Sequence, residues 1–236
     1  MIPAPDPGTR FTAWSAIVGG VFAYLNVALV LMATGGNTDL LFQGATMLAL
    51  PAQTRELFRW GMFADILGFY LPVLVIGAWL RHRFRASAGL PGDVALLAIT
   101  LYTVLGVAGA AVQIAALNPL AQMHAGGGEA ARAAAEAAWT AIAHASQKGL
   151  WWAEGPMVLF WGLVVGDQLR QAGWSRTQRI LLKIVGIGFG LFFVVGMLPG
   201  SEELMKLLLI VVVLIFPLWM LMFGWRLLRQ EPETTS

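Results

Sequence analysis

The sequence predicts an all-α fold, a polytopic membrane protein built as a bundle of six transmembrane helices, and three observations lead to this class. Hydrophobic residues make up 58% of the chain and charged residues 12%, against about 25% charged residues in soluble domains. The mean hydropathy is +0.72. Six segments are long and apolar enough to cross a bilayer as helices, which takes about 20 residues each.

The six predicted spans cover more than half of the chain, so we expect one transmembrane domain over residues 1–236 and no separate soluble domain. The spans are residues 11–33, 57–80, 94–117, 149–169, 180–198 and 204–228. The first span is longer than the apolar core of a signal peptide, and no small-residue cleavage site follows it. We therefore keep it as a span.

The basic residues predict the orientation. An inside N-terminus places ten of the 15 Lys and Arg residues on the cytoplasmic side. These ten are Arg10, Arg81, Arg83, Arg85, Arg170, Arg176, Arg179, Lys183, Arg226 and Arg229. Short loops next to span ends carry most of them, and there the positive-inside rule is strongest. We expect a multi-pass protein of the plasma membrane with both termini cytoplasmic.

The loops differ in length and composition. The two cytoplasmic loops are short, so the second and third spans, and the fourth and fifth, should be antiparallel neighbours. In the first outer loop, the partly apolar run 40–50 predicts a short helix lying in the membrane interface. The Ala-rich segment 129–147 predicts a helix that leads directly into the fourth span.

Several classes of function are disfavoured by composition. A net charge of +2 gives no reason to expect a nucleic-acid partner. The chain has no Cys, which excludes disulfides and thiolate chemistry. His82, His124 and His144 all lie outside the predicted spans, and their spacing matches no metal-ligand motif. We therefore predict neither a metal nor another cofactor.

Four polar side chains fall well inside predicted spans, where such residues are costly in hydrocarbon. They are Asn26, Asp65, Gln113 and Glu154. At 1.5 Å of rise per residue, Asp65 lies roughly 6 Å and Glu154 roughly 9 Å from the centre of its span. All four fall in the outer half, which predicts a polar layer there. For Tyr70 and Tyr102, nearer the inner half, we expect only local hydrogen bonds.

Among these four residues, Asp65 is the strongest candidate for a binding site. Gly61 and Gly68 share its helix face, so another helix could approach closely and shield the carboxyl group from lipid. Arg55, Arg59 and Lys148 are candidate ionic partners. The alternative is an interhelical hydrogen bond that only holds the bundle together.

Glu154 follows Trp151 and Trp152 and precedes Pro156. Pro156 has no amide proton for the Trp152 carbonyl, so we expect a kinked or widened helix there. The alternative is an interfacial Glu beside an aromatic belt. Most Trp residues are expected to be interfacial anchors, and Trp151 and Trp152 could also line the mouth of a pocket. Asn26 and Gln113 are more typical of helix–helix contacts than of ligand binding.

A Gly-x-x-x-Gly pattern lies in the fifth span, between Gly186 and Gly190. In an apolar span such a pattern favours close helix packing. Gly-rich faces of this kind could join spans within one chain or join two copies in a homo-oligomer.

A longer stretch resembles a bacterial family of six-span integral membrane proteins of unknown function. The stretch is 53–68, in which Arg59-Trp60-Gly61 opens the second span and Asp65-Ile66-Leu67 follows one turn later. The likeness extends to Asp39, Ala45-Thr46, Asn118, Phe160-Trp161-Gly162-Leu163, Trp219 and Trp225. The loop 175–179 departs from it, because the family tends to have Pro and Gly there. The resemblance implies a bacterial inner-membrane location and no catalytic residue.

Three functions are compatible with these features. The outer polar layer could bind or move a small ligand, a lipid or an ion, with Asp65, Glu154, Asn26, Gln113, Arg59, Trp151 and Trp152 as candidate binding residues. A structural or accessory subunit would need no such site. An intramembrane enzyme could use Asp65 and Glu154 as an acid/base pair, although no nucleophile motif accompanies them. The bilayer itself is the one partner that composition predicts directly.

Overall fold

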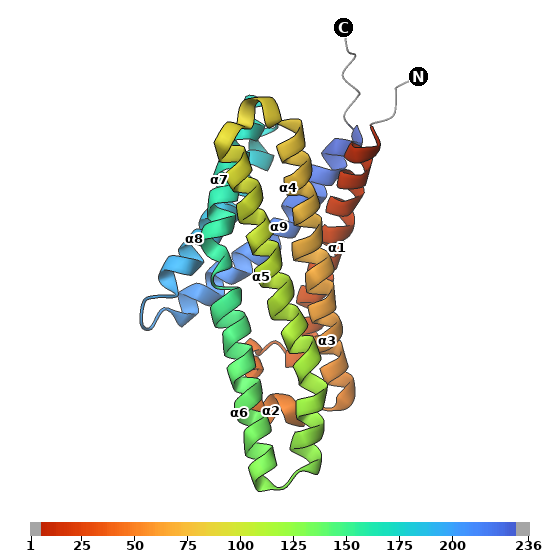
Figure 1. Cartoon of the computed structure of the whole chain (residues 1–236), viewed down its shortest axis with the longest axis vertical. Coiled ribbons are helices and arrows are strands. Elements are labelled where there is room, and N and C mark those ends of the chain that lie inside the picture. The colour runs from red at the N-terminus through yellow and green to blue at the C-terminus, as the bar shows by residue number, and fades with distance from the viewer. Residues whose placement is uncertain (1–5, 230–236) are drawn as a thin grey trace.

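The computed structural model describes residues 6–229, and every regular element in that range is helical (Figure 1). In chain order the elements are α1 (Pro7–Thr34), the 3-10 helix η1 (Thr38–Phe42), α2 (Gly44–Ala49), α3 (Ala52–Asp65), the π-helical turn η2 (Ile66–Tyr70), α4 (Leu71–Arg83), α5 (Arg85–Gly126), α6 (Glu129–Ala145), the π-helical turn η3 (Ser146–Leu150), α7 (Glu154–Gln171), α8 (Arg176–Val195) and α9 (Glu202–Arg229). The predicted all-α class is confirmed for the described residues.

Five helical segments in the described range are long and apolar enough to cross a membrane. They are Pro7–Thr34, Ala52–Arg83, Arg85–Gly126, Arg176–Val195 and Glu202–Arg229. The predicted fourth span differs, because the chain forms only the 18-residue helix α7 there, and that helix contains Glu154, Asp167 and Arg170. The structure thus supports a helical membrane bundle, while the six-span count stays a prediction.

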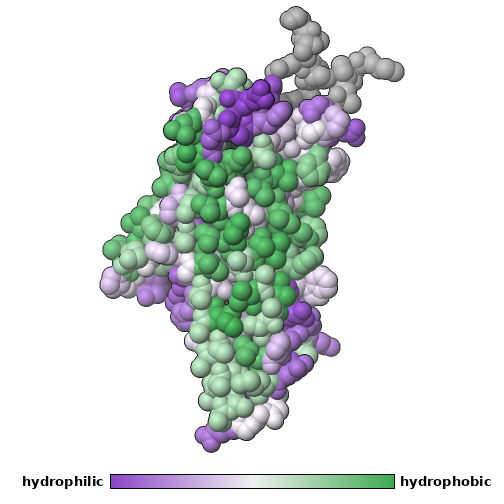
Figure 2. All heavy atoms as spheres, viewed as in Figure 1, coloured by the Kyte–Doolittle hydropathy of each residue, from purple (hydrophilic) through white to green (hydrophobic). Residues whose placement is uncertain are grey.

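The two ends of the bundle differ in charge. Helix α1 begins and α9 ends at the same end, where the connections α4–α5 and α7–α8 also lie (Figure 1). Hydrophilic residues gather at this end above a broad apolar band (Figure 2). We call it the basic end, since the clusters 81–85 and 170–183 lie there. The opposite end, where α5 passes into α6, is called the distal end.

The turn from α4 into α5 depends on one glycine. Gly89 has φ 48° and ψ −149°, a backbone conformation in which a side chain would be strained. The chain bends there, and the straight part of α5 follows Pro91 and runs the length of the molecule (Figure 1). Helix α5 can therefore pack on α4 and α7 near the basic end and on α6 near the distal end.

The first outer loop packs on α6. Trp139 is fully buried and donates its Nε1 proton to the Leu41 carbonyl at 2.9 Å. Gly44 touches the Glu136 backbone so closely that a Cβ atom would lie 2.2 Å from its carbonyl oxygen. The helical content predicted for 40–50 is present as η1 and α2. The loop also packs on Trp139 and on the backbone of α6, while its predicted place in the membrane interface stays a prediction.

Helix α6 confirms the Ala-rich helix predicted over 129–147, and the turn η3 follows it toward α7. A break at residues 151–153 separates the two helices. The predicted antiparallel pairs are also present, with α4 packed on α5 and α7 packed on α8.

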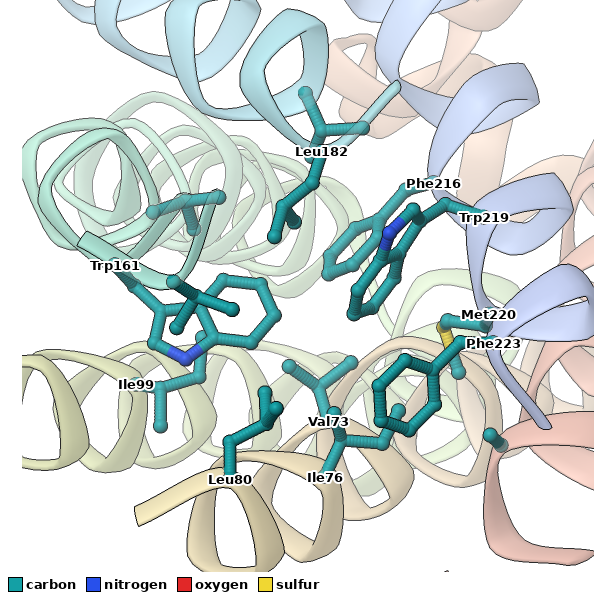
Figure 3. Close-up of a cluster of buried hydrophobic side chains, with 14 of the residues drawn as sticks. Val73, Ile76, Leu80, Ile99, Trp161, Leu182, Phe216, Trp219, Met220 and Phe223 are labelled. Carbon is teal, nitrogen blue, oxygen red and sulfur yellow. The ribbon is translucent and has the colours of Figure 1, made fainter. Parts of the chain in front are cut away.

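Aromatic side chains fill the core toward the basic end (Figure 3). Trp161 and Trp219 meet edge to face with ring centroids 5.7 Å apart, and Phe216 packs on both. Trp139, Trp161 and Trp219 are almost completely buried, so the expectation that most Trp residues are interfacial anchors is wrong for these three. Trp14, Trp60 and Trp225 are more than half exposed, as that expectation requires.

The Gly-x-x-x-Gly face of α8 joins helices within the chain. A Cβ atom at Gly186 would lie 3.3 Å from the Gly162 Cα on α7, and one at Gly190 would lie 2.7 Å from the Leu159 side chain. The face is thus covered by α7 in a single copy and is not free for a second one.

Candidate functional site

Asp65 is the last residue of α3, and its side chain lies inside the bundle. The residue is 6% exposed. The two glycines on its face pack against α1, where a Cβ atom at Gly68 would lie 2.4 Å from the Ala23 nitrogen and one at Gly61 would lie 3.2 Å from Val30. The predicted small-residue face around Asp65 is therefore present, and α1 is the helix that approaches it.

A π-helical turn begins directly after Asp65. The Leu71 amide donates to the Ile66 carbonyl, five residues earlier, where a regular helix would use the residue four earlier. Pro72 follows and has no amide proton of its own to donate. Residues five apart point about 140° apart on a regular α-helix. The extra residue of the π turn reduces this angle, so Tyr70 comes round to the face of Asp65.

Glu154 is the first residue of α7 and is 3% exposed. A second π turn, η3, precedes it, with Trp151 donating to the Ser146 carbonyl at 2.9 Å. The Trp152 carbonyl then accepts the Gly155 amide at 3.2 Å. The disruption expected from Pro156 is confirmed, although a tight turn satisfies the Trp152 carbonyl and leaves no free acceptor there.

These two carboxyl groups come from different helices and lie on the inside of the bundle. The Glu154 carboxyl group lies within electrostatic range of Asp65 and of the Tyr70 phenol. Tyr102 on α5 packs on Tyr70 with ring centroids 5.0 Å apart. We call Asp65 and Glu154 the carboxyl pair.

Each carboxyl group keeps one oxygen without a hydrogen bond. Asp65 Oδ2 and Glu154 Oε1 are both buried, and no donor among the described residues reaches either atom. In an apolar interior such an atom costs roughly 1–3 kcal/mol. The arrangement therefore favours a bound proton or cation over two bare carboxylates.

The three cations predicted as ionic partners of Asp65 interact with other groups. Arg55 donates to the carbonyls of Leu48 and Leu50. Arg59 Nη1 pairs with Glu56 Oε1 at 2.7 Å. Lys148 Nζ lies 4.7 Å from the centroid of the Phe42 ring. Arg59 is thus a poor candidate for the site, because its guanidinium already serves an ion pair on α3.

Asn26 and Gln113 are buried but do not join the carboxyl pair. Asn26 donates to the Gly61 carbonyl at 2.9 Å, which ties α1 to α3. Gln113 donates to the Gly109 carbonyl at 3.2 Å and accepts Gln147 Nε2 at 3.3 Å. Both amides act as interhelical or local hydrogen-bonding groups. The predicted layer of four polar residues is therefore divided into a carboxyl pair and two separate amides.

Trp151 and Trp152 brace the helices around Glu154. Trp151 donates its Nε1 proton to the Gly106 carbonyl at 3.3 Å. Trp152 donates to the Phe193 carbonyl at 2.9 Å and stacks on that ring at 4.2 Å. Their indoles tie the segment before α7 to α5 and α8 and thereby help to position Glu154.

The histidines lie apart from the carboxyl pair. His124 Nε2 and Glu136 Oε1 are 2.9 Å apart. His144 packs on Phe42, and burial, followed by the charge of Lys148, lowers the pKa of His144 below its usual range. Within residues 6–229 no group of three or more His, Asp or Glu is placed to hold a metal ion.

The sequence reasoning missed Tyr70 and Tyr102, which it assigned only local hydrogen bonds. Tyr102 does donate to a carbonyl, that of Phe69 at 3.1 Å, but both rings also adjoin the carboxyl pair. Pro72 was the available signal, because a proline inside a span disturbs the helix register of the residues before it. Gly106 was a second signal, since it leaves space for the Tyr70 ring.

Comparison with known proteins adds no family to this description: no family model, no curated protein and no solved structure matches the chain.

Proposed function

We propose that this chain is an inner-membrane protein of six spans with both termini in the cytoplasm, as in the bacterial family that it resembles. Its basic end would face the cytoplasm by the positive-inside rule. Helix α1 begins and α9 ends at that end, as an even number of crossings requires (Figure 1). Helix α7 would be the fourth of the six spans, added to the five long apolar segments, with Asp167 and Arg170 near its cytoplasmic end.

We further propose that the carboxyl pair binds a proton or a small cation inside the bundle. One observation carries this proposal: Asp65 and Glu154 are buried together, each with an oxygen that no donor of the described chain reaches. Ionisable residues within membrane segments commonly mark ion or proton sites. The π turns beside both residues support the same view, because such turns often occur at functional sites.

Bound ions have suitable ligands here. The two carboxyl groups supply oxygen ligands, which hard cations prefer. Tyr70 adds a phenol that can donate to one carboxyl oxygen. When no cation is bound, a proton shared between Asp65 and Glu154 would remove the repulsion between two like charges. Moving such an ion between the two sides of the membrane would require an opening toward each side in turn.

A purely structural role is the competing function, and the braces formed by Asn26, Gln113, Trp151 and Trp152 favour it. Those four side chains use their polar atoms in hydrogen bonds. The carboxyl pair does not complete its own, so structural stabilisation explains it poorly. An intramembrane enzyme is a weaker alternative, since no nucleophile has been placed beside the pair.

The deciding experiment compares Asp65→Asn and Glu154→Gln with Glu56→Gln. Glu56 lies on the same helix as Asp65 but on its surface, where Asn118 and Arg59 bind it. The purified proteins are melted across a pH series and with added Na⁺, K⁺ or Ca²⁺. We expect a pH- or cation-dependent midpoint in the wild type and in Glu56→Gln.

Both site variants should fold, because Asn and Gln keep the shape of the side chains. They should lose the cation response and the part of the pH response that the carboxyl pair contributes, because the charge is removed. Identical responses in all four proteins would leave the structural role as the better explanation.

A further inference from the structure

A second site lies at the basic end, between α7 and α8. A hollow of about 280 Å³ opens there. Its lining is Gly166, Arg170, Arg176, Arg179, Ile180 and Lys183. We call it the basic hollow. Four of its six lining residues are cations, and they gather around one opening.

The acid beside the basic hollow neutralises only part of this charge. Asp167 Oδ1 lies 3.0 Å from Lys183 Nζ and 3.8 Å from Arg170 Nε. One carboxylate thus faces two of the cations, while Arg176 and Arg179 contribute two further positive charges. The hollow has a clear excess of positive charge, which would attract an anion.

Arg179 has an unpaired donor beside the basic hollow, as Arg55 and Arg59 have elsewhere in the chain. Its Nε atom is buried, and no acceptor among the described residues reaches it. Arg176 and Arg179 also lie in the first turn of α8, which Ser175 caps by accepting the Gln178 amide at 3.3 Å. Cations are unfavourable at a helix N-terminus, whereas an anion is favourable there. A bound anion would accept a hydrogen bond from Arg179 Nε. Its negative charge would also offset the repulsion between the two arginines and the positive end of the α8 dipole.

An apolar stripe leads away from the basic hollow along α8. Ile180 lines the hollow and begins the stripe, and Ile184, Ile187 and Leu191 continue it at helical spacing. These side chains are between 37% and 47% exposed. A ligand with an anionic head and hydrocarbon tails would match both surfaces, with its head in the hollow and its tails on the stripe.

We propose that the basic hollow binds the phosphate of an anionic phospholipid. Arg guanidinium groups match phosphate oxygens in a bidentate geometry. Anionic lipids are attracted to basic pockets between spans on the cytoplasmic side. This proposal goes beyond the carboxyl pair, which lies deeper in the bundle, and it uses none of the same residues.

The test measures lipid binding to the purified protein in detergent by native mass spectrometry and by thermal shift. The probes are a phosphatidylglycerol, a phosphatidylcholine with the same acyl chains, and inorganic phosphate. We expect the phosphatidylglycerol to bind and raise the melting midpoint, and phosphatidylcholine to have little effect. Binding should weaken as salt rises, since screening reduces such contacts.

The site-specific variant is Arg176→Gln combined with Arg179→Gln, and its matched control is Arg85→Gln, an exposed cation at the same end but outside the hollow. At about a factor of five per cation, the double variant should bind phosphatidylglycerol at least about tenfold more weakly. Arg85→Gln should bind as the wild type does. Arg179→Lys keeps the charge without the planar fork and should lie between them.

Equal binding by the double variant and the control would overturn the proposal, and so would equal stabilisation by both lipids. If inorganic phosphate alone gives the full shift, the hollow binds a soluble phosphate, and the lipid assignment is wrong. If the double variant fails to fold, the comparison of Arg179→Lys with Arg85→Gln decides instead. The carboxyl-pair variants should bind phosphatidylglycerol normally, so the two proposals can fail separately.

Discussion

Tyr102 on α5 donates its phenol proton to the carbonyl of Phe69 at 3.1 Å, and Phe69 lies inside the π turn that follows Asp65. The bond joins α5 to the one stretch of the second span whose helical register is shifted. Thr103 adds a contact of 3.4 Å to the Tyr70 carbonyl beside it. We infer that α5 holds the π turn in place and thereby keeps Tyr70 beside the carboxyl pair.

Replacing Tyr102 by Phe tests this role. The variant leaves the Phe69 carbonyl buried without its donor, which should lower the free energy of unfolding by about 1 kcal/mol. The pH or cation response of the melting midpoint should also change, because Tyr70 loses its fixed position. Both quantities come from the same melting series.

Tyr24→Phe is the matched control. Tyr24 donates to the Leu214 carbonyl at 2.8 Å, away from the carboxyl pair. It should lower stability by a similar amount and leave the ion response intact. If the two variants give the same response, Tyr102 only stabilises the bundle.

Much of this fold could be predicted from the sequence, and the reason is the bilayer. Hydrocarbon requires long apolar helices with their backbone groups paired internally, so composition and length locate most of the helices directly. The burial of Asp65 could be predicted in the same way, because Gly61 and Gly68 identify a face that a neighbouring helix covers.

The partners of the carboxyl pair could not be predicted as easily. Tyr70 lies within electrostatic range of Glu154 in a stretch whose helix register η2 shifts, and hydropathy carries no signal for one extra residue in a turn. Arg59 was predicted as a partner of Asp65 because it is near Asp65 in sequence. It pairs with Glu56 instead, because these two side chains lie three residues apart on the same face of α3. Competing partners of this kind become visible only when the packing is known.

Gly106 should be essential for the site. A Cβ atom there would lie 1.8 Å from Tyr70 Cε1, so Gly106→Ala must displace the Tyr70 ring or part of α5. Overpacking of this kind costs roughly 1–3 kcal/mol. We expect a lower melting midpoint and a weakened ion response in the purified variant.

Gly126→Ala is the control for that substitution. Gly126 ends α5 and has no atom within 4 Å of an added Cβ. The variant should be neutral or slightly more stable, since Ala favours a helix over Gly. A normal ion response in Gly106→Ala would show that the Tyr70 position does not matter for binding.

His144, in the last turn of α6, should make its contact with Phe42 sensitive to acid. Its pKa is lowered by burial and by Lys148, so the folded state binds a proton less readily than the unfolded chain does. The stability that neutral His144 contributes is therefore present above about pH 6.5 and is lost as the pH falls through the lowered value. The melting midpoint of His144→Gln should depend less on pH between 8 and 5 than that of the wild type.

His82→Gln, at the basic end, serves as the control and should keep the wild-type dependence. An unchanged pH profile in His144→Gln would mean that its packing on Phe42 does not limit protonation.

Single cysteines can decide the topology, because the chain has no Cys of its own. Ser87 lies in the first turn of α5 and Thr177 in the first turn of α8, and both helices begin at the basic end, whereas Gly128 lies between α5 and α6 in open space. Ser87→Cys and Thr177→Cys should both be protected from a membrane-impermeant maleimide in intact cells, while Gly128→Cys should be labelled. Thr177 is the informative position, since the side of the membrane on which it lies depends on whether α7 crosses.

If Thr177→Cys is labelled together with Gly128→Cys, α7 is not a span, and the six-span arrangement is wrong. If Ser87→Cys and Thr177→Cys are labelled in intact cells and Gly128→Cys is protected, the distal end does not face outward, and the proposed orientation fails.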